Sequence, residues 1–174
     1  MRMNKKGITQ QVFIYIFVAF VIGIVFIFGF KILKDLNETK RIAIYQDFKI
    51  NLKNDVENIF YKSPGSIIEF SSRSSRKPLI LPEDVIKVCV KDKNRNLDNS
   101  EVSKLKQDEK FTVENLDKNI ILFGGNYNAF DINNLNLKPE KNPLCFRIVN
   151  GRFSFILESK FEGDENFVEI REIS

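Results

Sequence analysis

The chain contains no histidine and no tryptophan among its 174 residues, and it has only two cysteines. Histidine is the most common general base and the most common metal ligand in proteins. Its absence excludes hydrolase triads with a histidine base and every histidine-containing zinc site. Two cysteines alone supply too few soft ligands for a structural zinc site. We therefore expect neither a metal nor any other cofactor.

Other catalytic patterns are also missing. The acidic pair Glu83-Asp84 falls in a predicted turn, where solvated carboxylates are far more common than catalytic ones. Gly124-Gly125 is not followed by the Lys-Ser/Thr of a phosphate-binding loop. The sequence predicts that the protein is not an enzyme and has no small-molecule substrate.

The net charge is modest, at +4, with 27 Lys and Arg against 23 Asp and Glu. The basic residues are scattered among acids and accompany no nucleic-acid-binding motif, so no nucleic-acid partner is predicted. Several of them instead flank one apolar run, where basic side chains are typical anchors to anionic lipid headgroups. These flanking residues are Arg2, Lys5, Lys6, Lys31, Lys34, Lys40 and Arg41.

The apolar run occupies residues 12–30 and contains no charged residue. As a helix it would measure about 28 Å, close to the ~30 Å hydrocarbon core of a bilayer. It is longer than a signal-peptide core and no small-residue cleavage site follows it. A buried core helix is the alternative, but no face of the run is polar. We predict one transmembrane helix in contact with membrane lipid.

Residues 1–11 form a short basic tail without an acid, which favours a cytoplasmic position for the tail. The predicted location is therefore the cell membrane, with a single span and with the C-terminal domain outside the cytoplasm. The basic residues that follow the span oppose this orientation.

Residues 31–62 are predicted to extend the same helix with an amphipathic segment. Apolar residues recur there at spacings of three and four, which is helical periodicity: Tyr45, Phe48, Leu52, Val56 and Ile59. Ser63-Pro64-Gly65 should end the helix. One helix from about Ile8 to Lys62, bent near Asn37-Glu38-Thr39, is expected.

Residues 63–174 are predicted to form a β-rich domain. Alternating apolar residues and turn signals indicate strands at 66–70, 79–81, 85–91, 119–123, 129–132, 144–149, 152–158 and 167–173. A polar loop is expected at 71–78, and the charged segment 92–110 is expected to be either a loop or a short surface helix near 100–108. The predicted fold class is α+β, with the long N-terminal helix packed on a mostly antiparallel sheet.

The two cysteines are predicted to lie on the more polar faces of their strands. Asn150-Gly151 is typical of a two-residue type I′ hairpin turn, and this pairing places Cys145 opposite the core face. Strand alternation likewise separates Cys89 from Val88 and Val90. A free cysteine is normally buried, so a Cys89–Cys145 disulfide explains these positions, and an extracytoplasmic location would permit it. Two separate thiols are the alternative.

Asn37-Glu38-Thr39 also fits the N-glycosylation pattern, which makes Asn37 a candidate acceptor about seven residues beyond the span. Such triplets are common by chance.

The segment Lys5-Lys6-Gly7-Ile8-Thr9 before the apolar run resembles the cleavage region of archaeal type IV prepilins, the class III signal peptides. That resemblance implies peptidase cleavage between Gly7 and Ile8. Many of these families carry Glu at the fifth mature position, where this chain has Val12. The segments VIKVCVKD, NIILFGG and LCFRIVNGRFSFILE are similar to uncharacterised archaeal single-pass membrane-anchored proteins. This second resemblance implies where the protein is placed and says nothing about an activity.

The leading hypothesis is an anchored extracytoplasmic structural or interaction protein, a pilin-like subunit or minor pilin. It would pack with itself or with other pilin-like subunits through the N-terminal helix. The alternative is a monomeric anchored binding module for an envelope component or a protein partner.

Overall fold

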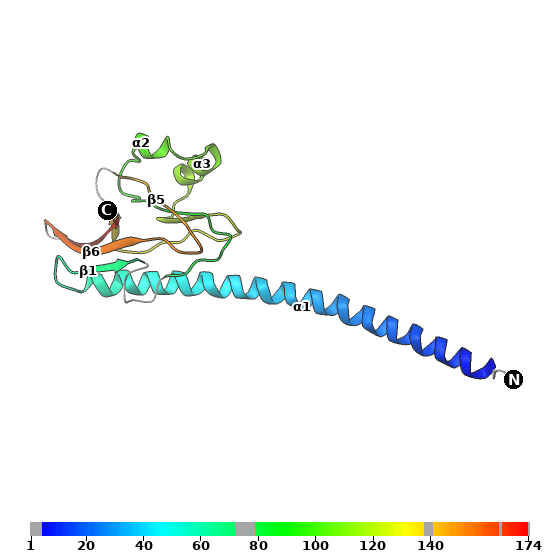
Figure 1. Cartoon of the computed structure of the whole chain (residues 1–174). Coiled ribbons are helices and arrows are strands. Elements are labelled where there is room, and N and C mark those ends of the chain that lie inside the picture. The colour runs from blue at the N-terminus through cyan, green and yellow to red at the C-terminus, as the bar shows by residue number, and fades with distance from the viewer. Residues whose placement is uncertain (1–4, 72–78, 138–140, 164, 174) are drawn as a thin grey trace. The chain divides into compact units, whose positions relative to one another are not determined.

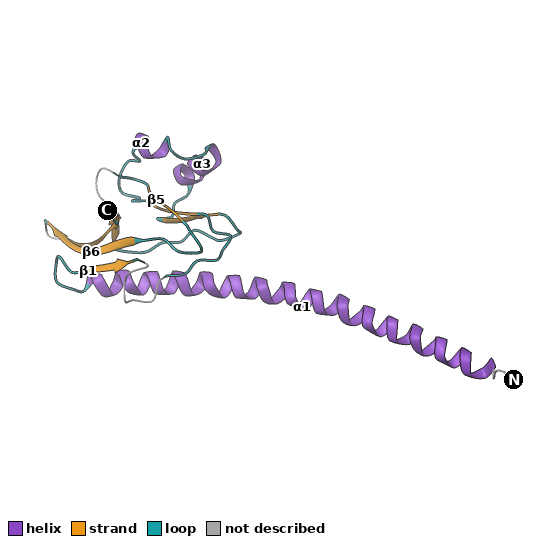
Figure 2. Cartoon of the chain, viewed as in Figure 1, coloured by secondary structure: helices purple, strands orange, loops and turns teal. Residues whose placement is uncertain are grey.

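The computed structural model describes residues 5–71, 79–137, 141–163 and 165–173. The fold is α+β, as predicted (Figure 1). The chain divides into two compact units, Met1–Ile42 and Ala43–Ser174. The described residues form three helices and seven strands, in the order α1 (Lys5–Phe60), β1 (Ile67–Phe70), β2 (Lys87–Val90), α2 (Asn99–Val102), α3 (Gln107–Asn115), β3 (Ile120–Phe123), β4 (Leu135–Leu137), β5 (Leu144–Arg147), β6 (Phe155–Glu162) and β7 (Glu165–Glu172) (Figure 2).

Helix α1 is continuous from Lys5 to Phe60 and runs through residues 37–39 without interruption. It ends just before Ser63-Pro64-Gly65, as predicted. Gly65 has φ of +83°, a conformation that costs glycine little, and its N–H donates to the Ser159 carbonyl at 2.8 Å. The end of the helix is thereby joined to β6.

The amphipathic stripe of α1 belongs to the core of the second unit, as its periodicity predicts. Its five members are Tyr45, Phe48, Leu52, Val56 and Ile59, each 7% exposed or less. They join one apolar cluster with residues of both sheets, including Ile68, Leu122 and Leu157. The helix is therefore a structural layer of the domain.

The strands form two sheets where the sequence indicated one. The first has the order β1-β6-β7-β4, and its β4–β7 pair is parallel. The second has the order β3-β2-β5 and is entirely antiparallel. The inner faces of both sheets contribute to the same core.

The type I′ turn prediction is confirmed, but the expected hairpin is wrong. Asn150 and Gly151 have φ of +52° and +69°, and Val149 and Arg152 exchange backbone hydrogen bonds of 2.9 and 3.1 Å. The two arms then separate, because β5 pairs with β2 whereas β6 pairs with β1 and β7. Phe155 stacks on Phe70 of β1, with ring centroids 4.6 Å apart. The turn therefore links the two sheets.

Several other local expectations differ from the structure. Residues 79–81 are not a strand, although Leu81 is buried and its N–H donates to the Gly151 carbonyl at 2.8 Å. Residues 129–132 form only an isolated bridge, from Phe130 to Ile120. The single helix near 100–108 is replaced by α2 and α3, and β4 was not foreseen. The predicted loop at 71–78 lies outside the described residues beyond Ser71.

Candidate functional site

The apolar part of α1 is exposed on every side within the chain. From Phe13 to Phe30 the large apolar side chains are between 38% and 73% exposed. Among the described residues, one helix near the N-terminus is long and apolar enough to cross a membrane. The alternative of a helix buried in the chain's own core does not describe this segment, because none of its most apolar window is buried.

The residues predicted for processing and glycosylation lie on the same helix. Gly7 and Ile8 are helical, within the first turns of α1. Asn37 is exposed, and Thr39 two residues later donates its hydroxyl to the Asp35 carbonyl at 2.9 Å. Cleavage after Gly7 and modification of Asn37 remain predictions.

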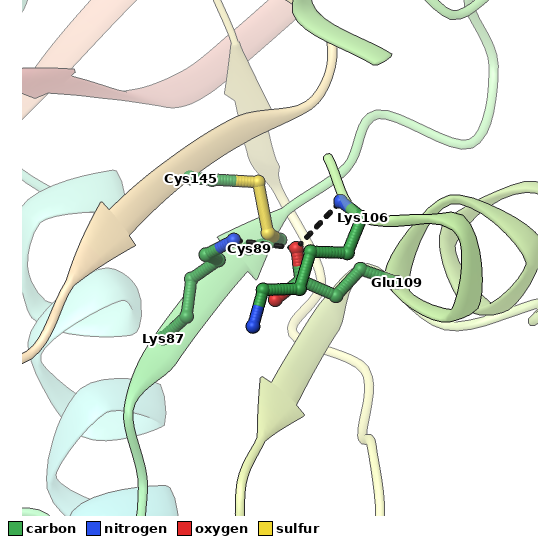
Figure 3. The surroundings of a disulfide bond; sticks show 5 residues. All are labelled: Lys87, Cys89, Lys106, Glu109 and Cys145. Atoms are coloured by element: carbon green, nitrogen blue, oxygen red, sulfur yellow. Dashed lines mark hydrogen bonds and ion pairs between the residues drawn. A yellow bond between two sulfur atoms is a disulfide. The ribbon is translucent and has the colours of Figure 1, made fainter. Parts of the chain in front are cut away.

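Cys89 and Cys145 form the disulfide that the sequence indicated (Figure 3). The two residues face each other in register on β2 and β5, with Cα atoms 4.0 Å apart. Directly opposite residues of antiparallel strands have their Cβ atoms close together, so two cysteines at such positions can bring their sulfur atoms within bonding distance of each other. The described residues contain no free cysteine.

Both cysteines lie on the opposite face of their sheet from Val88 and Phe146 of the main core, as predicted, but that face is covered and not open to solvent. Cys89 is fully buried and packs with Val113 and Ile121 in a second, smaller apolar cluster. Partly buried leucines complete this cluster: Leu97, Leu105 and Leu116. These come from the charged segment that contains α2 and α3, so that segment covers the outer face of the three-stranded sheet.

Two lysines attach α3 to the sheet above the disulfide: Lys87, the first residue of β2, and Lys91, the residue that follows β2. The Lys87 ammonium lies 2.5 Å from Oε2 of Glu109, which is buried and also accepts the Lys106 N–H at 3.2 Å (Figure 3). The Lys91 ammonium donates to the carbonyls of Val113 and Leu116, at 2.8 and 3.1 Å. The face of β2 that carries Lys87 and Lys91 is therefore covered by α3. The two ammonium groups extend to the edge of the covered area and bind there.

The other carboxylates of the domain are mostly held by partners. Asp84 accepts the Tyr127 hydroxyl at 2.8 Å, and Asp131 pairs with Lys118 at 2.7 Å and Lys93 at 3.2 Å. Burial alone would raise the pKa of Asp131, but the hydrogen bonds from Lys118, Lys93 and the Asn119 N–H outweigh it and lower that pKa. Over the described part of the chain, no group of three acidic, cysteine or histidine residues could hold a metal ion.

A groove of about 600 Å³ was not foreseen from the sequence. It lies where β1 ends and β6 begins, and its lining includes Phe70, Arg147, Val149, Arg152, Phe153 and Ser154. Arg147 ends β5 and Arg152 belongs to the turn that joins the two sheets, so only the tertiary fold brings them beside the end of β1.

A comparison with known protein families, characterised proteins and solved structures finds nothing that matches this chain.

Proposed function

We propose that this protein is a single-pass membrane-anchored subunit of a pilin-like assembly, with its β-rich head outside the cytoplasm. The observation that carries the proposal is the continuity of α1. One helix supplies the exposed apolar segment from Phe13 to Phe30 and the buried stripe from Tyr45 to Ile59. Because no loop separates anchor from head, the anchor is part of the element on which the head is built.

The exposed apolar segment needs a partner that is not water. Burying an apolar side chain contributes about 1.5–3 kcal/mol, so more than ten exposed ones strongly favour lipid or other apolar helices. A lipid bilayer satisfies all faces at once, and packed copies of the same helix satisfy them equally well. The resemblance of residues 5–9 to a prepilin cleavage region favours a subunit that passes from the first environment to the second.

Two observations support an extracytoplasmic head. Disulfides persist mainly in oxidising compartments, and Cys89–Cys145 is a disulfide. The tail that precedes the span carries Arg2, Lys5 and Lys6 without an acid, which favours retention of the tail on the cytoplasmic side. A protease added to intact cells should therefore remove the head, and full protection until the membrane is opened would contradict the orientation.

Mass spectrometry of the mature N-terminus tests the pilin-like assignment. We expect the mature chain to begin at Ile8, and Gly7→Val to block this processing because the resemblance puts the cut after Gly7. Gly29→Val is the matched control: an added Cβ there meets open space, so processing should be unchanged. A mature chain that begins at Met1 or Arg2 would contradict prepilin-like processing.

A monomeric anchored binding module is the second candidate, and the arginine-lined groove favours it. A monomer would keep its helix among lipids and use the groove for a foreign partner. Cysteines placed at four consecutive positions, 24–27, sample all faces of one helical turn. Crosslinking between copies at any of them supports the subunit, whereas its absence at all four supports the monomer.

A further inference from the structure

We propose that the heads of this protein join end to end, with the acidic tip of the β6–β7 hairpin of one copy docking in the arginine-lined groove of the next copy. This inference rests on the proposed function in one respect, that copies of the chain assemble. It adds the surface by which the heads recognise each other.

The groove carries positive charge that the described part of the chain leaves uncompensated. Arg147 and Arg152 are exposed, and neither guanidinium group forms an ion pair or hydrogen bond with another described residue. Both lie on one face of the turn, flanking Val149, which is 62% exposed. Arg147 also lies directly opposite Lys87 on β2, and like charges at such positions destabilise a sheet. The Glu109 carboxylate neutralises the charge of Lys87. The Arg147 guanidinium has no such acidic partner among the described residues and is free to bind an anion.

The hairpin tip carries the complementary pattern. Glu162 and Glu165 are the last pair of the β6–β7 ladder, directly opposite each other and exposed. Neither has an ion-pair partner among the residues that the structure describes. Phe161 beside them is 58% exposed, so more than half of this large aromatic side chain faces water. Because side chains alternate along a strand, the two carboxylates lie on one face of the hairpin end and the Phe161 ring on the other.

The two patterns match in charge and in chemistry. A carboxylate is the preferred bidentate partner of a guanidinium group, and two of each are available. The groove also offers apolar walls for Phe161, from Phe70 and Phe153. Arginine and aromatic side chains are both enriched at the energetic centres of protein interfaces.

The positions of the two surfaces make the contact intermolecular. The groove lies at the beginning of β6 and the acidic tip at its end, eight residues later. Eight residues of strand span about 26 Å, so the tip of one head cannot reach its own groove. A contact between different surfaces of successive copies is heterologous, and it generates a ring or an open filament. The contact is too small to hold a dimer alone, since stable interfaces bury about 800 Å² per partner, so it would act together with helix packing.

Crosslinking of full-length copies in membranes tests the contact. One copy carries Ser154→Cys in the groove and a first tag, and the co-produced copy carries Asn166→Cys, opposite Phe161, and a second tag. The native cysteines are bonded to each other and do not react. A short thiol crosslinker should give a species with both tags.

Charge reversal then gives the decisive comparison. R147E/R152E in the first copy, or E162K/E165K in the second, should each reduce the crosslinked fraction at least about tenfold, and the two together should restore it. K53E/K110E changes the net charge equally at exposed positions outside both surfaces and should have no effect. Phe161→Ala should also weaken the contact, whereas Phe111→Ala, which removes a ring on α3 that is 68% exposed, should not.

The helix cysteines at 24–27 separate this inference from the proposed function. Helix crosslinks that persist while the head crosslink responds to charge reversal support both. Helix crosslinks with a head crosslink that is absent, or that ignores charge reversal, overturn the docking contact and leave the assembly intact. Absence of crosslinks at both places overturns the two proposals together.

Discussion

The ammonium group of Lys87 lies 2.5 Å from the carboxylate of Glu109, and the Glu109 side chain is only 4% exposed. The pair joins β2 to the first turn of α3 across the rim of the apolar cluster that covers the cystine. The backbone N–H of Lys106 donates to the same carboxylate oxygen. One buried acid thus satisfies two donors and fixes the start of a helix.

Glu109→Ala should lower the free energy of unfolding by about 2–3 kcal/mol, because it leaves the Lys87 ammonium and the Lys106 N–H without their acceptor. Urea unfolding of the full chain in detergent, followed by circular dichroism, measures this loss. Glu114→Ala is the matched control on the same helix, since its carboxylate lies 3.8 Å from Lys110 at the surface. It should change stability by less than about 0.5 kcal/mol.

Removal of the cystine should destabilise the head by about 4 kcal/mol on the chain-entropy model, because 56 positions separate Cys89 and Cys145. The double variant Cys89→Ala/Cys145→Ala tests this in the same unfolding assay. A reductant should shift the unfolding of the parent toward that of the variant and leave the variant unchanged. Full thiol labelling of unfolded, unreduced parent protein would contradict the disulfide.

Leu52→Ala should cost about 3 kcal/mol, because Leu52 is 1% exposed and its loss leaves a cavity between α1 and the sheets. Ile50→Ala is the control two residues earlier, with a side chain 53% exposed, and should cost much less. Equal effects of the two substitutions would show that the second half of α1 is not part of the core.

Asp131 should contribute stability that disappears in acid. Its pKa in the folded chain is lowered, although burial opposes this, because Lys118, Lys93 and the Asn119 N–H stabilise the carboxylate. A lowered folded pKa stabilises the fold above the unfolded pKa of about 3.9, and that stability is lost as pH falls through the folded value. The difference in unfolding free energy between the parent and Asp131→Asn should therefore shrink as pH falls from about 5 to about 2.

Asp117→Asn is the control for this pH dependence. The Asp117 side chain is 92% exposed and lies 3.9 Å from Lys93, so its replacement should have little effect at either pH. A parent-to-Asp131→Asn difference that stays constant across the acid range would contradict the assigned role of Asp131.

The sequence correctly predicts those elements that are determined by residues close together in the chain. The spacing of Tyr45 to Ile59 predicts a buried helical face, and all five members are buried. Asn150-Gly151 predicts a type I′ turn, and both residues have positive φ. The Cys89–Cys145 pairing was also predicted, from a face assignment that the structure bears out, although the covering of that face by the segment with α2 and α3 was not foreseen.

The sequence fails where distant segments decide the outcome. Nothing local to Asn150-Gly151 indicates that the arms of the turn enter different sheets, because that depends on Phe70, Ile68 and β7 as partners of β6. The three residues of β4 are too few for a periodic signal, and their parallel partner follows some thirty residues later. The groove has no motif at all, since its arginines meet Phe70 only through the fold.

The pairing of β1 with β6 also sets the order in which the head can be completed. Ile67 pairs with Glu158, so the strand that follows α1 remains without its neighbour until about ninety more residues have been synthesised. Contacts so distant in the chain are slow to form and expose strand edges while they wait. Under the proposed orientation, with the head outside the cytoplasm, the chain would cross the membrane before β1 finds its partner. The buried stripe of α1 would then be the surface on which the arriving strands assemble.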